Sequence, residues 1–176
     1  QVEVLSIGGD VSDSEETLDL TFKSDTIAGM QAWYNAANTG SSLANGAVIE
    51  NWQDSSGYGR DMAFTSGNPR YYNSGLKGKP VVSFDGDDLM WTNHNFDHLL
   101  DTGYTMISLS RYTGSRNQRV ISSRNRNFLF GYEGALTGRW FAQGWISTAG
   151  PLDTQWHMHL GVIDKRNNPE ASFWRD

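Results

Sequence analysis

The sequence predicts an all-β protein that folds as an antiparallel two-sheet sandwich. Short segments of alternating apolar and polar residues recur along the 176 residues, as expected of half-buried strands. Aromatic residues make up 12% of the chain and glycines number 19, which favours strands joined by tight turns over a bundle of helices. One complete unit is visible at residues 79–89, where Pro80 opens a strand, Val81–Phe84 suit a pleated surface, and Asp85-Gly86 turns the chain.

The first strand is expected at the N-terminus, where Val2-Glu3-Val4-Leu5 alternates before an acidic, Ser-rich stretch. We therefore divide the chain into two parts. Residues 1–25 are an N-terminal strand and an acidic linker, which fits the tail of a preceding domain. Residues 26–176 are one sandwich domain, because the chain is too short for two ordinary domains. A second alternation within the linker, at 17–22, places Leu18, Leu20 and Phe22 on one face.

Further strands are expected at 30–34, 47–52, 60–64, 80–84, 104–111, 118–123, 127–132, 139–147, 155–164 and 170–174. One helical turn is allowed at 93–101, with Asn93 or Asn95 as its cap. The chain stops at Asp176, directly after the last of these strands, so we expect a sandwich that lacks its final strands and leaves a sheet edge unpaired.

Two strands carry large side chains whose direction matters for function. Along 155–164 the apolar residues Trp156, Met158, Leu160 and Val162 share one face, which predicts that this face is core and that His157 and His159 are exposed. Along 139–147, Trp140 and Trp145 fall on opposite faces, so one of the two rings must cover something other than the core.

Composition excludes several classes of function. The net charge of −6 and the pI near 5.1 disfavour a nucleic-acid partner, and the arginines between Arg111 and Arg126 fit a solvated strand face better than a polyanion site. Cysteine is absent, which excludes disulfides, thiolate metal sites and a thiol nucleophile. No run approaches the roughly 18 apolar residues of a membrane span, so no direct membrane insertion is expected.

Several blocks of the sequence resemble a known family. They are Ala32-Trp33-Tyr34-Asn35-Ala36, the segments 52–61, 69–71 and 75–89, and, less closely, 119–123 and 171–176. From about residue 28 onward the chain resembles the bacterial laminin-G-like, concanavalin A-like modules. The resemblance implies a two-sheet jelly roll, an extracellular or cell-surface location within a larger protein, and binding of glycans, proteins or neighbouring modules, sometimes with calcium. Members typically continue for a few strands past the final block, and a shared fold alone does not define the ligand.

An acidic turn is the candidate metal site. Asp85, Asp87 and Asp88 offer hard oxygen ligands within one turn, which is the chemistry that Ca²⁺ requires. The alternative is an Asp-Gly turn whose carboxylates cap backbone amides. The twelve-residue calcium loop of helix-loop-helix sensors is not matched.

A glycan surface is the candidate binding site. Flat rings stack on sugar faces while planar polar groups bind the hydroxyls, so Trp140 or Trp145 beside Arg124, Arg126, Arg139 and His157 is a plausible set. The alternative is that the rings only fill a sandwich core. The loop 52–61, with Asp54, Ser55, Ser56 and Tyr58, is interpreted mainly as turn geometry, and the pairs His94 with His98 and His157 with His159 mainly as exposed polar residues rather than metal ligands.

Three functions follow, in order of preference. The first is a non-catalytic recognition or adhesion module that binds a glycan or a neighbouring protein. The second is a structural module of a surface assembly without a free ligand. The third is a polysaccharide-active enzyme, for which the sequence offers neither the paired carboxylates of a glycosidase nor a nucleophile elbow, although a lyase-like set of Tyr132, Arg139 and His157 stays open.

Overall fold

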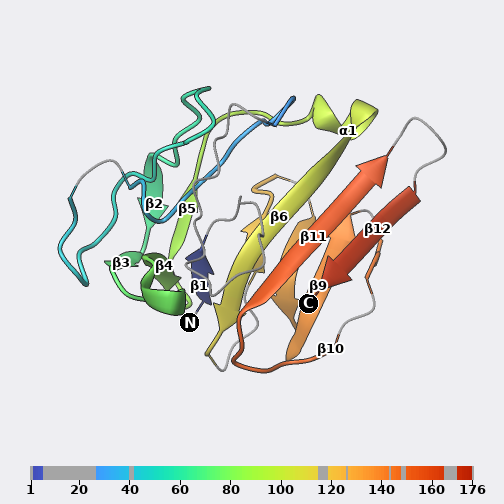
Figure 1. The fold of residues 1–176 in the computed structure, drawn as a ribbon. Helices are drawn as coiled ribbons and strands as arrows, with labels where there is room; N and C mark the ends of the chain where they lie inside the picture. Colours follow the sequence, from blue (N-terminus) through green and yellow to red (C-terminus); the bar gives the residue numbers. More distant parts are fainter. Residues whose placement is uncertain are drawn as a thin grey trace, which may run out of the picture.

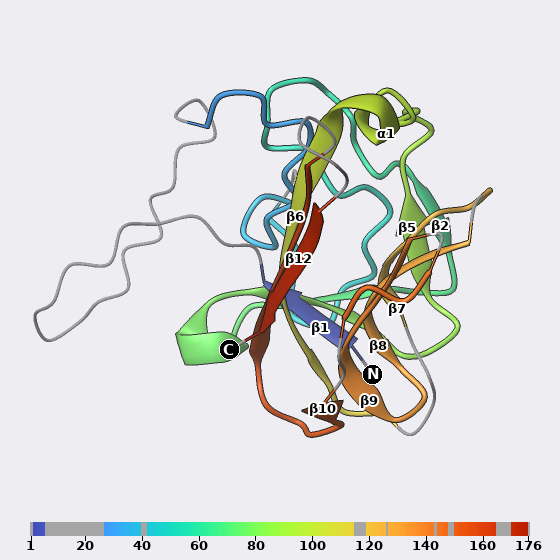
Figure 2. The same cartoon turned by 90° about the vertical axis from the view of Figure 1, so that its right-hand side faces the viewer.

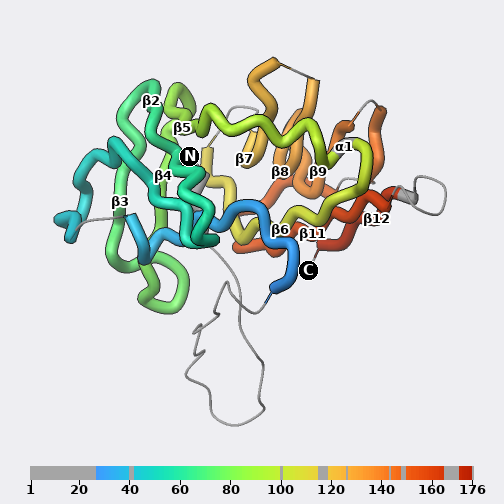
Figure 3. The backbone as a smooth tube through the Cα atoms, turned by 90° about the horizontal axis from the view of Figure 1, so that it is seen from above, coloured from blue at the N-terminus to red at the C-terminus, as the bar shows by residue number. Residues whose placement is uncertain are grey.

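The computed structural model describes residues 2–5, 27–39, 42–114, 119–125, 127–142, 144–147, 150–164 and 170–175. Within these residues the protein is an all-β sandwich of antiparallel sheets, which confirms the predicted fold class. Figures 1 and 3 show its two layers, with β6, β11 and β12 in one and β7, β8 and β9 in the other.

The larger sheet has six strands in the order β12-β11-β6-β1-β4-β3. Their bounds are β1 Val2–Leu5, β3 Arg70–Tyr72, β4 Val81–Phe84, β6 Gly103–Tyr112, β11 His157–Asp164 and β12 Glu170–Arg175. The N-terminal strand β1 lies between β4 and β6, where Val2 is opposite Phe84 on one side and Tyr112 on the other. The strand expected at residues 2–5 therefore shares one sheet with strands of the 26–176 region, while the linker at 6–25 lies outside the described residues.

Two smaller sheets complete the described fold (Figure 2). A four-stranded sheet has the order β10-β9-β8-β7, with β7 at Arg119–Ser122, β8 at Phe128–Glu133, β9 at Leu136–Ala142 and β10 at Gly150–Pro151. A pair of strands, β2 at Phe64–Ser66 and β5 at Leu89–Trp91, forms the third sheet.

Helical structure is limited to single turns in the described residues. The helical turn expected within 93–101 is present as α1, Leu99–Thr102, and a 3₁₀ turn spans Leu76–Gly78. His98, not an asparagine, occupies the N-cap position of α1. Asn95 instead caps a preceding turn, because its Oδ1 accepts a hydrogen bond from the backbone N–H of Asp97.

Most of the strands expected after residue 80 are confirmed, and the earlier ones are only partly correct. The segments 30–34 and 47–52 contain isolated bridges, such as Tyr34 with Asp54 and Trp52 with Met62, in place of strands. The strands β3, β5 and β10 were not predicted, because each has only two or three residues and shows no alternation.

The main core lies between the two larger sheets and is aromatic. Phe130 from β8 and Trp140 from β9 meet edge to face, with ring centroids 5.8 Å apart, and Phe173 of β12 packs against both. A second buried cluster of Ala36, Ile49, Trp52 and Val82 lies on the β3–β4 side of the six-stranded sheet. These rings and aliphatic side chains provide the apolar burial that holds the layers together.

The predicted orientation of β11 is wrong. His157, His159 and Gly161 face the interior, whereas Met158 is exposed and Trp156 is half-buried beneath the guanidinium of Arg111. Gly161 leaves room for the rings of Phe130 and Trp140. His159 contacts Thr137 of β9, and His157 contacts Asp153 in the loop before β11. The apolar residues of the alternating pattern consequently face outward.

Candidate functional site

The prominent aromatic feature of the four-stranded sheet is a ring stacked on an arginine. Trp140 points inward from β9, so the preceding residue, Arg139, points away from the six-stranded sheet. The chain then turns back, and the guanidinium carbon of Arg139 lies 3.6 Å from the centre of the Trp145 ring. Phe141 meets the same indole edge to face at 5.2 Å. We refer to Arg139, Phe141 and Trp145 as the Trp145 platform.

Hydrogen bonds fix the backbone that carries this platform. Ile146 donates its backbone N–H to the carbonyl of Trp140, and Ala142 donates to the carbonyl of Gly144. The hydroxyl of Ser147 accepts the N–H of Trp140 and donates to the carbonyl of Gly138. The segment 144–147 is therefore tied to β9, and the contacts of the indole with Arg139 and Phe141 hold its ring.

The exposure of the platform suits a flat ligand. Trp145 is 51% exposed although the guanidinium of Arg139 stacks on its ring, so about half of the residue stays open to solvent. Nε of Arg139 is buried and has no hydrogen-bond partner within the described part of the chain. A buried donor without a partner costs stability, and this nitrogen is too deeply buried for a ligand on the platform to reach.

The other residues predicted for the glycan surface lie elsewhere. Trp140 is 0% exposed and belongs to the core, so its assignment to a binding surface is wrong. His157 is also buried, on the inner face of β11. Arg124 is exposed but lies over the ring of Trp91 at 4.9 Å, next to the β2–β5 pair. Arg126 lies outside the described residues.

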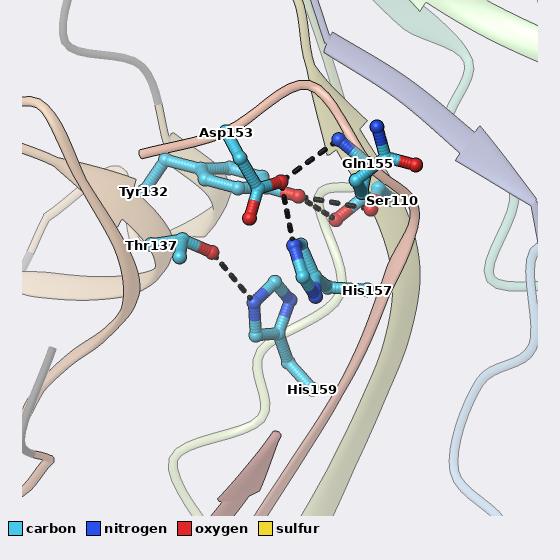
Figure 4. Close-up of polar contacts among 7 residues, drawn as sticks. All are labelled: Ser110, Tyr132, Thr137, Asp153, Gln155, His157 and His159. Atoms are coloured by element: carbon cyan, nitrogen blue, oxygen red, sulfur yellow. Dashed lines mark hydrogen bonds and ion pairs between the residues drawn. The ribbon is translucent and has the colours of Figure 1, made fainter. Parts of the chain in front are cut away.

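The two histidines of β11 belong to a polar cluster between the sheets (Figure 4). Nε2 of His157 lies 2.8 Å from Oδ1 of Asp153, and the Tyr132 hydroxyl donates to the carbonyl of Ser110. Nε2 of His159 lies 3.4 Å from the Thr137 hydroxyl.

This cluster is a buried network, not an open cleft. Tyr132, Thr137 and His159 are fully buried, and Asp153, with 46% of its side chain exposed, marks the solvent side. The hydrogen bond from His157 lowers the pKa of the Asp153 carboxyl below its usual value. Arg139 points away on the other face of β9, so the lyase-like set of Tyr132, Arg139 and His157 is not brought together.

The acidic turn follows β4. One carboxylate oxygen from each of Asp85, Asp87 and Asp88 lies within 4.8 Å of the others. Asp88 already has two structural contacts, because Oδ1 accepts the backbone N–H of Asn68 and Oδ2 accepts that of Asp85. A hydrogen bond between Asp85 and Asp87 lowers the pKa of the first carboxyl and raises that of the second. Ca²⁺ binding at this turn stays a prediction.

The loop 52–61 has the structural role predicted for it. The Asp54 carboxylate accepts the backbone N–H groups of Trp33, Ser56 and Arg60 together with the Ser56 hydroxyl. Burial alone would raise the pKa of Asp54, but these hydrogen bonds lower it below its ordinary value. Tyr58 is left exposed at the tip of this loop.

Comparisons with known proteins give no identification: no protein-family model, curated protein or solved structure matches the chain. The resemblance to laminin-G-like modules therefore stays a prediction. Among the described residues, no helix is long and apolar enough to cross a membrane.

Proposed function

We propose that this protein is a non-catalytic extracellular recognition module that binds a glycan through the Trp145 platform. The observation that carries the proposal is the half-exposed Trp145 ring held over Arg139 at 3.6 Å. Pyranose rings present flat apolar faces that stack on indole, and their hydroxyls accept hydrogen bonds from groups such as a guanidinium. The resemblance of the sequence to laminin-G-like modules supports the extracellular location.

The positions of the titratable residues favour binding over catalysis. A buried network holds His157, His159 and Tyr132, and a sugar polymer cannot reach a fully buried imidazole. The carboxylates of Asp54 and Asp88 are engaged by backbone N–H groups. General acid–base chemistry needs such groups within reach of the substrate.

A glycan-array screen followed by calorimetric titration of the best ligand tests the proposal. We expect Trp145→Ala to weaken binding at least tenfold, about 1.4 kcal/mol, and Trp145→Phe to retain part of it. The matched control is Trp174→Ala, because Trp174 is 53% exposed but lies on the six-stranded sheet. Unchanged affinity in Trp145→Ala, or no glycan bound by the unaltered protein, would contradict the proposal.

A second candidate function, packing against a neighbouring domain or subunit, is supported by an apolar row on the six-stranded sheet. Ile107, Leu160 and Trp174 are directly opposite one another on β6, β11 and β12, so their side chains share one face. Ile107 and Trp174 are exposed, as is Met158 two residues before Leu160. Exposed apolar rows of this kind mark protein contacts.

The second candidate has its own test. Ile107→Lys and Trp174→Lys should abolish association with neighbouring segments of the parent protein, measured by sedimentation velocity, and should leave glycan binding intact. Association that persists in both variants would exclude this face as the interface.

A further inference from the structure

The loop 52–61 and the segment before α1, which are far apart in the sequence, meet in the structure. Nη1 of Arg60 donates to both the backbone carbonyl and the side-chain Oε1 of Gln31, and Nε2 of His98 lies 3.3 Å from the same Oε1. The His94 ring lies 4.7 Å from that of Phe96 and 6.3 Å from that of His98. The loop 52–61 and the segment before α1 thus form one surface.

Aromatic rings hold the guanidinium of Arg60 on this surface. Its central carbon lies 4.6 Å from the centre of the Tyr58 ring and 5.6 Å from that of Phe96. Tyr58 is 60% exposed, so the side of the ring that Arg60 does not cover faces solvent. Stacking between rings fixes the guanidinium plane and leaves its outward N–H groups available. We refer to Gln31, Tyr58, Arg60, His94, Phe96 and His98 as the Arg60 cluster.

The Arg60 cluster brings a guanidinium and two imidazoles together on one surface. The guanidinium of Arg60 forms no ion pair within the described residues, and the rings of His94 and His98 lie near it. Burial, then Arg60 and His98, lower the pKa of His94, while Asp54 acts in the opposite direction.

The nearby carboxylates make hydrogen bonds with other groups than the Arg60 guanidinium. Asp54 and Asp61 accept backbone N–H groups of the loop, and the carboxylate of Asp97 lies next to the Asn95 side chain. A bound oxyanion would offset the unfavourable effect that Arg60 and His98 have on the charged form of His94.

We propose that the Arg60 cluster is a second binding site, which takes an acidic sugar whose ring stacks on Tyr58 and whose carboxylate or sulfate group reaches Arg60, His94 and His98. A guanidinium fork matches the geometry of both oxyanions. The adjacent open ring favours a saccharide over an acidic peptide, because a sugar offers a flat apolar face next to its charge. The site shares no residue with the Trp145 platform and does not depend on it.

The test titrates the protein with three oligosaccharides: oligogalacturonate, its methyl ester, and a sulfated galactan of similar length. The titrations are made near pH 5 and 7.5, because the pKa of His94 lies below the ordinary histidine value. We expect the uronate or the sulfate to bind, the neutral ester not to bind, and the affinity to rise several-fold at the lower pH. The two acidic ligands distinguish carboxylate from sulfate recognition.

Variants locate the binding. Arg60→Gln should weaken binding of the acidic ligand at least tenfold, and Arg70→Gln is the matched control, because Arg70 is exposed and also binds a backbone carbonyl. Tyr58→Ala should weaken binding without a change in melting temperature, and the double variant of His94→Gln with His98→Gln should remove the pH dependence. These two variants keep the test valid if Arg60→Gln unfolds the loop. Trp145→Ala should leave binding of the acidic ligand unchanged, which separates this site from the proposed function.

Four results would overturn the proposal. The first three are equal binding of the methyl ester, equal loss of affinity in Arg60→Gln and Arg70→Gln, and tighter binding of a poly-glutamate peptide than of either acidic oligosaccharide. Failure of all three oligosaccharides to bind would overturn it as well.

Discussion

Gly161 lies directly against the ring of Trp140. A Cβ atom at position 161 would stand 3.0 Å from Cζ3 of that indole and 2.8 Å from Cε2 of Phe130. Contacts this short are not tolerated between carbon atoms, so β11 can approach the four-stranded sheet only because this position has no side chain.

Gly161→Ala should therefore destabilise the fold by overpacking, by about 1 to 3 kcal/mol. Gly144→Ala is the matched control, because a Cβ atom there meets nothing within 4 Å. Urea denaturation followed by tryptophan fluorescence measures both variants. Equal stability of the two would show that the aromatic core can shift to accept the methyl group.

Asp54→Asn should destabilise the loop 52–61 at neutral pH by about 2 to 3 kcal/mol, because hydrogen bonds to a charged acceptor are lost and an amide N–H₂ faces other donors. The folded-state pKa of Asp54 is lowered, so its contribution is complete above the unfolded value near 3.9 and is lost as the pH falls through the folded value.

The stability difference between Asp54→Asn and the unaltered protein should accordingly shrink below about pH 4. Chemical denaturation at several pH values measures it, and Asp101→Asn, at an exposed position in α1, provides the control. A difference that does not change between pH 7 and 3 would argue against a role for the charge.

Asp88→Asn should lower the melting temperature equally in EDTA and in millimolar Ca²⁺, since both oxygens of Asp88 hold backbone N–H groups. The calcium hypothesis makes a separate prediction: Ca²⁺ raises the melting temperature of the unaltered protein by several degrees, and Asp87→Asn removes that rise. Differential scanning calorimetry distinguishes the two effects. An unaltered protein with the same melting temperature in both buffers would exclude a calcium site that stabilises the fold.

His157→Ala should cost more stability than Asp153→Asn. The imidazole is buried and its loss leaves a cavity, worth about 2 to 3 kcal/mol, whereas the half-exposed carboxylate contributes under about 1 kcal/mol. Because the hydrogen bond from His157 lowers the pKa of Asp153, that smaller contribution is present above about pH 4 and disappears below it. Urea denaturation at neutral pH compares the variants, and the reverse order would show that the contact between the two side chains outweighs the burial of the ring.

The sequence predicts the fold class and the strands β4, β6, β7, β8, β11 and β12, because long alternating segments and Asp-Gly turns are local signals. It does not predict which face of β11 is buried. That choice depends on Thr137 and Asp153, which provide the polar partners of the inward histidines, and on the ring of Trp140 above Gly161. Thr137 and Trp140 belong to β9 and Asp153 to the loop before β11, so the alternating pattern within β11 does not contain this information.

The prediction of the candidate sites from the sequence is limited in the same way. The segment 139–147 is predicted to have one tryptophan ring outside the core, and Trp145 is indeed exposed while Trp140 is buried. The predicted reason is wrong, because β9 ends at Ala142 and Trp145 lies on the segment that turns back against it. The contact of Arg60 with Gln31 and Phe96 joins segments about 30 residues apart on either side. Local sequence patterns do not show which distant segments come into contact. Tyr58 and the pair His94 and His98 are each noticeable in the sequence, but their proximity is not.

The position of β1 has a consequence for the order of folding. Val2 pairs with both Phe84 and Tyr112, so β1 has to wait until residue 112 has left the ribosome before its sheet can close. Pairings of this sequence separation are slow to form. During synthesis, β4 and β6 both have unpaired edges until β1 lies between them. A chaperone or a strand of another chain can bind these edges in that interval.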